Sequence, residues 1–134
     1  MDKVYNFSIN TKKSDEFVNI TSFLKKSVAD SNIKDGTAVI FCPHTTAGIT
    51  INENADPDVV RDILVNLDKT FPERGDYHHM EGNSHAHIKA SLMGSSATVI
   101  IQDSHLLLGI WQGVYFCEFD GPRSRKFHIK IVEG

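Results

Sequence analysis

Three strand-like runs fill the last third of the chain and constrain the fold more than any other feature of the sequence. They cover residues 97–102, 110–119 and 126–132, which read ATVIIQ, IWQGVYFCEF and KFHIKIV. These runs are rich in β-branched and aromatic residues, which are typical of strands. The short segments between them suit hairpin-like connections, which join antiparallel strands. The C-terminal third is therefore predicted to build a sheet.

Further strand-like runs alternate with helix signals in the first two thirds of the chain. The runs cover residues 4–9, 37–42 and 48–53. A first helix is predicted to follow a cap at Thr21 or Ser22 and to end before the turn at residues 35–36. A second helix is predicted to start at Asp56 and Pro57, because an acidic cap followed by proline is a typical helix start.

A third helix is predicted just before the C-terminal strands. Asn83 or Ser84 would cap it, and Gly94 would end it. Strands with intervening helices and hairpin-like connections indicate an α+β fold, in which helices pack against a mostly antiparallel, sandwich-like sheet. With 134 residues the chain suits one core, so residues 1–134 are predicted to form a single domain.

The composition limits the partners that the protein would bind. The formal net charge is -3, so no basic excess points to nucleic acid or to an anionic membrane surface. No apolar run approaches the roughly 18 residues that cross a bilayer. Cys42 and Cys117 lie in apolar runs, where a reduced cysteine acts as a small buried hydrophobe. We expect a cytoplasmic protein that binds small molecules or copies of itself.

The stretch HHMEGNSHAH, residues 78–87, concentrates four histidines in ten positions. If its first part is extended, only one of His78 and His79 faces inward. On a helix His85 and His87 point about 200° apart, so both cannot bind one metal ion. His87 lies deeper in the helical pattern and is the candidate ligand, whereas His85 is expected to face solvent near the helix start.

His44 is the natural partner of these histidines from elsewhere in the chain. The run CPHTTAG places it just past a buried strand, in a loop that can line a cleft. Three histidines with an open fourth position are typical of a catalytic metal site, and histidine suits zinc better than magnesium. The alternative is that these histidines form hydrogen bonds in loops and bind no metal.

A second group of binding residues lies in LGIWQGVYFCEFDGPRSRK, residues 108–126. Arg123 and Arg125 alternate, so in an extended segment they share a face and could grip a phosphate. Glu118 is either a solvent-facing acid or a catalytic one. Trp111 would by default fill a core or an interface, and Gln112 follows it directly.

A third group of polar residues lies in TINENADPD, residues 50–58. It places Asn52, Glu53 and Asn54 at the end of a strand. These side chains either cap the helix that follows or contact a ligand.

Three blocks of the chain resemble the signature blocks of the YjbQ-type family, the so-called secondary thiamine-phosphate synthases. The blocks are CPHTTAGITINENADPDV, YHHMEGNSHAHIKASLMG and LGIWQGVYFCEFDGPRSRK, and the resemblance covers essentially the whole chain. The histidines of the family pattern fall on His44, His79 and His87, which selects His79 over His78. One departure is Ile110, where the family usually has a threonine hydroxyl.

The resemblance implies a small α+β fold that assembles as a homotrimer, with the histidines near a subunit boundary. It also implies thiamine-phosphate synthase activity, in which a thiazole phosphate attacks a pyrimidine methylene carbon and pyrophosphate leaves. Glu118 or Glu53 would handle a proton, and Arg123 would neutralise the departing anion. The residues expected to bind the substrates are Asn83, Lys89, Trp111, Gln112 and Arg125.

Two other functions fit the same residues. A divalent metal, zinc, on His44, His79 and His87 would make the protein a hydrolase of a small phosphorylated or acyl substrate, with metal-bound hydroxide as the nucleophile. Alternatively, the protein is a non-enzymatic trimeric module that binds a small anion. The expected ligand is a small phosphorylated metabolite, and magnesium would enter only as the escort of pyrophosphate.

Overall fold

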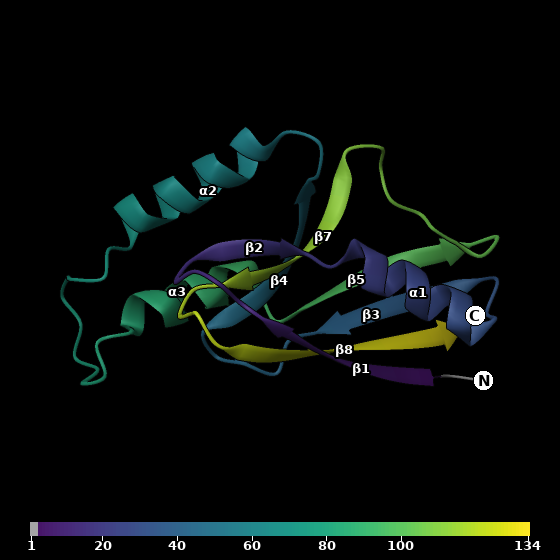
Figure 1. Cartoon of the computed structure of the whole chain (residues 1–134), viewed down its shortest axis with the longest axis horizontal. Coiled ribbons are helices and arrows are strands. Elements are labelled where there is room, and N and C mark those ends of the chain that lie inside the picture. The colour runs from purple at the N-terminus through teal and green to yellow at the C-terminus, as the bar shows by residue number, and fades with distance from the viewer. Residues whose placement is uncertain (1–2) are drawn as a thin grey trace.

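The computed structural model describes residues 3–134, which form eight strands and three helices (Figure 1). In chain order the elements are β1 (Lys3–Asn10), β2 (Glu16–Asn19), α1 (Thr21–Ser31), β3 (Gly36–Phe41), β4 (Ala47–Glu53), α2 (Pro57–Thr70), α3 (Ser84–Met93), β5 (Ser96–Gln102), β6 (His105–Leu106), β7 (Gln112–Glu118) and β8 (Ser124–Glu133). Every strand pairing among these residues is antiparallel. The predicted α+β fold with a mostly antiparallel sheet is confirmed.

The strands form two sheets. The larger sheet has the order β1-β8-β3-β5-β6, and the smaller has the order β2-β7-β4. β7 and β8, which come from the C-terminal strand-like runs, are thus inner strands with a neighbour on each side. β7 begins at Gln112, later than predicted, because the Gln112 N–H closes a turn onto the Gly109 carbonyl at 3.0 Å.

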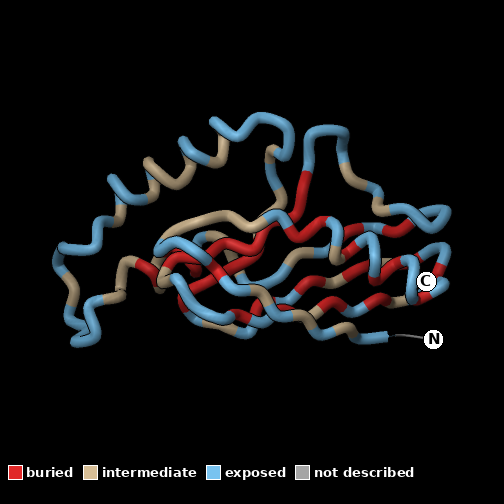
Figure 2. Tube along the Cα trace, in the orientation of Figure 1, coloured by how far each residue is buried: buried red, intermediate tan, exposed pale blue. Residues whose placement is uncertain are grey.

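The main core joins the two sheets and α1. Leu24 of α1, Ile40 of β3, Phe116 of β7 and Phe127 of β8 are all inaccessible to solvent and belong to one apolar cluster. Each buried side chain of this size stabilises the fold by about 1.5–3 kcal/mol. The buried segments in Figure 2 follow β3, β7 and β8, so the core runs along the length of both sheets.

A second apolar cluster lies on the other face of β7. Successive residues of a strand point to opposite faces, so Tyr115 and Cys117 turn away from Phe116. They pack with Phe119 and with Ala86 and Ala90 of α3, all in one cluster. β7 is therefore buried on both faces, and α3 is fixed against the smaller sheet on the face opposite the main core.

α2 is the most peripheral helix. It starts as predicted, with Pro57 in its first turn and the Asp56 carboxylate accepting a hydrogen bond from the Asp58 N–H at 2.9 Å. None of its residues is fully buried, and Figure 1 shows it at the rim of the fold. Its apolar stripe reaches the second cluster only through Val60, Leu64 and Leu67.

The caps of the other two helices differ from the prediction. No side chain caps α1 from Thr21 or Ser22; instead the Asn19 carboxamide oxygen accepts from the Thr21 N–H at 3.0 Å. Asn83 occupies the cap position of α3, but its side chain makes no cap hydrogen bond. The Asn83 side chain instead donates a hydrogen bond to Asp120, a residue far along the chain.

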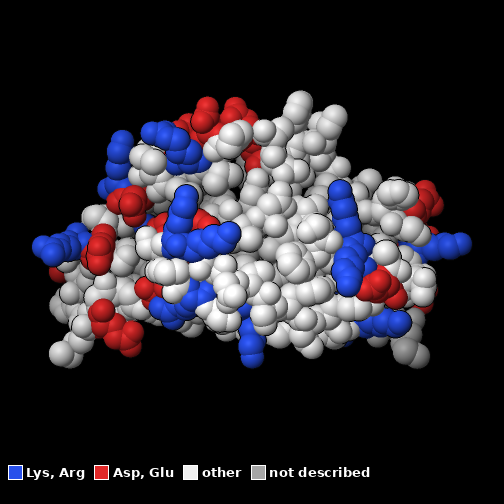
Figure 3. All heavy atoms as spheres, viewed as in Figure 1, with Lys and Arg blue, Asp and Glu red and all other residues white. Residues whose placement is uncertain are grey.

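No helix within residues 3–134 is long and apolar enough to cross a membrane. On the face shown in Figure 3, basic and acidic side chains are interspersed around an uncharged central area. Cys42 and Cys117 are both buried and free, as predicted.

Candidate functional site

His44 lies in the connection between β3 and β4. Its Nε2 accepts a hydrogen bond from the backbone N–H of Lys126 on β8 at 2.9 Å. Its ring also meets the Phe116 ring edge-on, with the centroids 6.4 Å apart. The imidazole is therefore held by two elements of different sheets, at the end of the core.

His79 and His87 lie side by side. His87 is on α3 and His79 is in the loop between α2 and α3. Their ring centroids are 5.6 Å apart, and the ring planes are nearly perpendicular, at 89°. His78 and His79 are both exposed, so the prediction that one of the two consecutive histidines faces inward is wrong, although His79 does contact His87.

Two adjoining cavities bring these histidines together. One, of about 500 Å³, is lined by His44, Thr45, Ala47, His87, Ala90, Ser91, Gly94 and Ser95. The other, of about 260 Å³, is lined by Thr45, Thr46, His79, Glu81, Asn83, His87, Asp120 and Arg123. Because Thr45 and His87 line both, the two cavities adjoin, and together they are here named the His87 cleft. All three histidines of the sequence prediction border it.

The three histidines nevertheless do not make a metal site. Within residues 3–134 no group of three or more His, Cys, Asp or Glu side chains is arranged to hold a metal ion. One nitrogen of His44 is already occupied by the Lys126 N–H, and His79 and His87 meet edge to face. The donors share a cleft without converging on a point, so the prediction of a three-histidine zinc site is wrong.

Arg123, Asp120 and Asn83 form a polar network in the wall of the cleft. The Asn83 amide donates to Asp120 Oδ2 at 3.0 Å, and Arg123 Nη2 lies 3.1 Å from the same oxygen. The Arg123 Nε–H also donates to the Asp120 backbone carbonyl at 2.9 Å. The network joins the start of α3 to the loop after β7, and it leaves the Asn83 Oδ1 buried without a hydrogen-bond partner.

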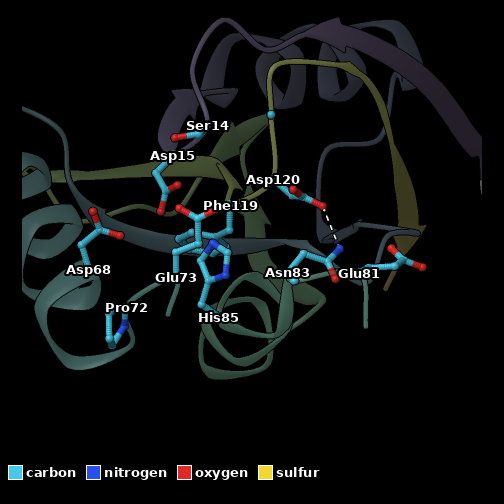
Figure 4. Close-up of a pocket in the computed structure, with 12 residues that line it drawn as sticks. Ser14, Asp15, Asp68, Pro72, Glu73, Glu81, Asn83, His85, Phe119 and Asp120 are labelled. Atoms are coloured by element: carbon cyan, nitrogen blue, oxygen red, sulfur yellow. Dashed lines mark hydrogen bonds between the residues drawn. The ribbon is translucent and has the colours of Figure 1, made fainter. Parts of the chain in front are cut away.

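The Asn83–Asp120 hydrogen bond also borders a second cavity, of about 450 Å³ (Figure 4). Its lining includes five acidic residues, which are Asp15, Asp68, Glu73, Glu81 and Asp120. His85 lies there too, half-buried, with a buried Nδ1 that lacks a partner in the described chain. The expectation that His85 faces solvent is therefore wrong.

Glu118 and Arg125 form a buried ion pair behind the cleft. The guanidinium contacts the carboxylate through Nε and Nη2, and Nη2 also donates to Thr46 Oγ1 at 2.8 Å. Glu118 accepts further hydrogen bonds from the Thr11 hydroxyl at 2.7 Å and from two backbone N–H groups. Burial raises the pKa of Glu118, but the hydrogen bonds from Arg125 and Thr11 outweigh it and the pKa is lowered. The pair fixes the cleft wall through Thr46, and its charged atoms are already engaged.

The ammonium group of Lys89 is likewise bound to side chains of the same protein chain. Its side chain is completely buried, and its ammonium contacts Asp15 at 2.8 Å and Asp68 at 2.6 Å. Burial lowers the pKa of Lys89, but the two carboxylates outweigh it and the pKa is raised. The ammonium also lies 5.9 Å from the centre of the Phe119 ring. Lys89 therefore ties α3 to α2 and to the loop before β2.

Glu53, Trp111 and Gln112 lie far from the His87 cleft. Glu53 pairs with Gln112 at one end of β4 and β7, whereas Ala47 pairs with Glu118 at the other. Six residue steps of about 3.3 Å separate the two ends by about 20 Å. Gln112 borders a different cavity, of about 520 Å³. The structure thus does not bring these residues to the histidines.

Several residues of the cleft had no role in the sequence prediction. Thr45 and Thr46 follow His44 directly, so the polar run after the buried strand was a usable signal. Glu81 and Ser91 had no signal of their own, because their places depend on how α3 packs.

Comparison with known proteins identifies the family. The model of the family described as "UPF0047 protein YjbQ-like" matches residues 5–134. The chain belongs to the YjbQ/UPF0047 family. A UPF0047 protein of Methanocaldococcus jannaschii, MJ1081, is 53% identical over 129 residues, which cover 96% of this chain and 94% of the relative. The UPF0047 protein YugU of Bacillus subtilis is 51% identical over 92% of this chain and 95% of its own length.

Solved structures of the YjbQ/UPF0047 family share the fold. An uncharacterised protein of this family from Clostridium acetobutylicum superposes with a TM-score of 0.95 at 66% identity, covering 96% of this chain and 99% of that one. A YbjQ-like protein of unknown function from Sulfolobus solfataricus has a TM-score of 0.93 at 29% identity, with full coverage of both chains.

These relatives correct the predicted activity. They are named as UPF0047 proteins or as proteins of unknown function, and none of the names carries thiamine-phosphate synthase or transferase activity. Together with the lack of a metal-binding group in residues 3–134, this makes the predicted synthase with a metal pocket, and its zinc-dependent alternative, wrong for this chain.

Proposed function

We propose that the His87 cleft binds a small phosphorylated metabolite and that His79 and His87 exchange protons with it without a metal ion. The observation that carries this proposal is that two neighbouring imidazoles and Arg123 line one cavity. Histidine is the commonest general acid or base, because imidazole can carry or release a proton near neutral pH. An arginine beside such a pair can hold the phosphate of the reacting molecule.

The start of α3 also supports an anionic ligand. The first turn of α3 contains no acidic residue, and no side chain caps it. Free N–H groups and the helix dipole favour an anion at such an end. Arg123 keeps N–H groups beyond those bound to Asp120, because a guanidinium has five donors. Thr45 adds a hydroxyl to the same cavity.

Glu81 opposes the anion and therefore offers a directional test. Its carboxylate borders the same cavity as Arg123. If phosphate binds there, Glu81→Gln tightens the binding of inorganic phosphate by about threefold at low salt, the size expected for an exposed charge pair. Unchanged or weaker binding in this variant would place the phosphate elsewhere.

The binding experiment compares two consecutive histidines. Titration calorimetry with inorganic phosphate is expected to show about tenfold weaker binding in His79→Ala, through loss of one hydrogen bond to a charged ligand. His78→Ala is the matched control, because the His78 side chain is 96% exposed and does not border the cavity that contains Arg123. Equal phosphate binding by both variants would contradict the proposed site.

The proton-transfer step has its own experiment. A panel of phosphorylated metabolites is incubated with the protein, and turnover is followed by phosphorus NMR. His87→Ala is expected to lower the rate by about 10²-fold or more, the usual contribution of a general acid or base, while some binding persists. A rate unchanged in a folded His87→Ala protein would remove His87 from the chemistry.

We also propose that the protein is a homotrimer, as the family resemblance implies. Large exposed apolar side chains support an assembly: Ile110 is 87% exposed and Trp111 is 60% exposed. Exposed groups of this kind mark interaction surfaces. Light scattering after size exclusion is expected to give three times the monomer mass, and Ile110→Glu is expected to lower it.

We propose a cytoplasmic location as well. The two cysteines of the described chain are free and buried, which suits a reducing compartment. Fractionation of cells that express the tagged protein tests this directly.

A further inference from the structure

His44 has an unusual role in the larger sheet. The ladder between β3 and β8 ends at the pair of Phe41 and His128. Lys126 lies two residues beyond that pair, and its backbone N–H donates to His44 Nε2 at 2.9 Å. The imidazole thus serves as the acceptor for a backbone donor that β3 no longer reaches.

This hydrogen bond determines where His44 carries its proton. A neutral imidazole has one N–H, and the nitrogen that accepts a hydrogen bond carries none. Because Nε2 accepts from Lys126, the neutral ring is the tautomer with its proton on Nδ1. No group among residues 3–134 is hydrogen-bonded to Nδ1, although His44 borders the His87 cleft. One imidazole N–H therefore remains for a ligand.

The surroundings of His44 disfavour a second proton on the ring. Protonation would place an N–H against the N–H of Lys126. Burial lowers the pKa of His44, and the positive charges of Arg125 and Arg123 lower it further. The carboxylate of Glu118 acts in the opposite sense, but it is already paired with Arg125.

We propose that His44 determines ligand specificity in the His87 cleft: it is a neutral Nδ1–H donor, fixed by the Lys126 backbone, that recognises an acceptor oxygen of the ligand. The recognition step rests on the proposed function, whereas the tautomer does not. His44 neither gives up nor takes a proton during turnover, unlike His79 and His87. A phosphate or carbonyl oxygen satisfies such a donor, and an ammonium group does not.

The tautomer is tested without a ligand. Long-range proton–nitrogen NMR correlation spectra of protein labelled on histidine distinguish the two tautomers and the imidazolium ion. The His44 signals, identified by their loss in His44→Gln, are expected to show a protonated Nδ1 and a bare Nε2 at pH 7. A proton on Nε2, or an imidazolium ion at pH 7, would overturn the inference.

The recognition step is tested by two matched substitutions. Asparagine places an amide nitrogen near the position of Nδ1, whereas glutamine reaches the position of Nε2. His44→Asn is expected to bind inorganic phosphate within about threefold of wild type, and His44→Gln about tenfold more weakly. Melting temperatures show whether both variants are folded.

The outcomes separate the two proposals. If wild type binds phosphate and His44→Gln binds it equally well, the donor role is refuted while the proposed function stands. If wild type does not bind phosphate, the proposed function and the recognition step both fail, and the NMR result still decides the tautomer.

Discussion

The guanidinium of Arg125 on β8 contacts the carboxylate of Glu118 at the end of β7, and both side chains are almost completely buried. Removing one partner of such a pair leaves an uncompensated charge in the interior. Arg125→Met is therefore expected to lower the free energy of unfolding by about 3–5 kcal/mol, measured by urea denaturation. Arg123→Met is the control: Arg123 is half-exposed, and its loss should cost about 1 kcal/mol or less. Similar losses in both variants would contradict a buried role for the pair.

The stability of the protein is expected to fall as the pH drops below the ordinary histidine range, in part because of His44. Its pKa in the folded protein lies below the unfolded value of 6.5. The unfolded chain therefore binds more protons at this group, so its contribution is present above pH 6.5 and is lost toward lower pH. Urea denaturation between pH 7.5 and 5.5 should show a shallower pH dependence in His44→Asn than in wild type. Parallel pH profiles would show that His44 has no lowered pKa.

Lys89 is expected to hold the last turns of α2 in place. Lys89→Met keeps the apolar stem but leaves Asp15, a mostly buried carboxylate, without its cation. The expected loss is about 1–3 kcal/mol, together with faster hydrogen exchange of α2 amides. Asp68→Asn should have a smaller effect, because the Asp68 side chain is 67% exposed. Unchanged hydrogen exchange of the α2 amides in Lys89→Met would show that the Lys89 ion pairs do not hold this helix in place.

Gly48 allows α3 to approach β4 closely. A Cβ at this position would lie 2.6 Å from the Gly94 carbonyl oxygen and 3.0 Å from Met93 Cβ. Gly48→Ala is therefore expected to cost about 1–3 kcal/mol and to weaken phosphate binding, because α3 carries His87. Gly109→Ala is the control, since its Cβ would meet only the flexible Gln112 side chain. A stable Gly48→Ala protein with normal binding would contradict this account.

Most of the fold could be predicted from local sequence patterns. The start of α2 at Asp56 and Pro57 needs only residues close in the chain, and the runs that became β3, β7 and β8 are strongly apolar. β2 (Glu16–Asn19) and β6 (His105–Leu106) were missed, because they are short edge strands defined by their partners. The sequences of β2 and β6 are too short to show a clear preference for strand structure by themselves.

The histidines that border the candidate site could be predicted from the sequence, but their lack of a common metal ion could not. The family resemblance placed His44, His79 and His87 together, and they share the His87 cleft. Their failure to converge on a metal depends on ring orientation, which a backbone N–H from β8 sets for His44. Lys89 and Arg125 were expected to bind an anion, but carboxylates distant in sequence occupy them. Such non-local partners leave no local signal.

β7 (Gln112–Glu118) sets the distance between two surfaces of the protein. One end carries Glu118 and the wall of the His87 cleft, and the other follows the exposed Ile110 and Trp111. Since the strand is buried on both faces, its length is fixed by the sheet and not by either surface. A substitution at Ile110 is therefore expected to act on the proposed interface between copies without displacing the distant histidines of the proposed binding site.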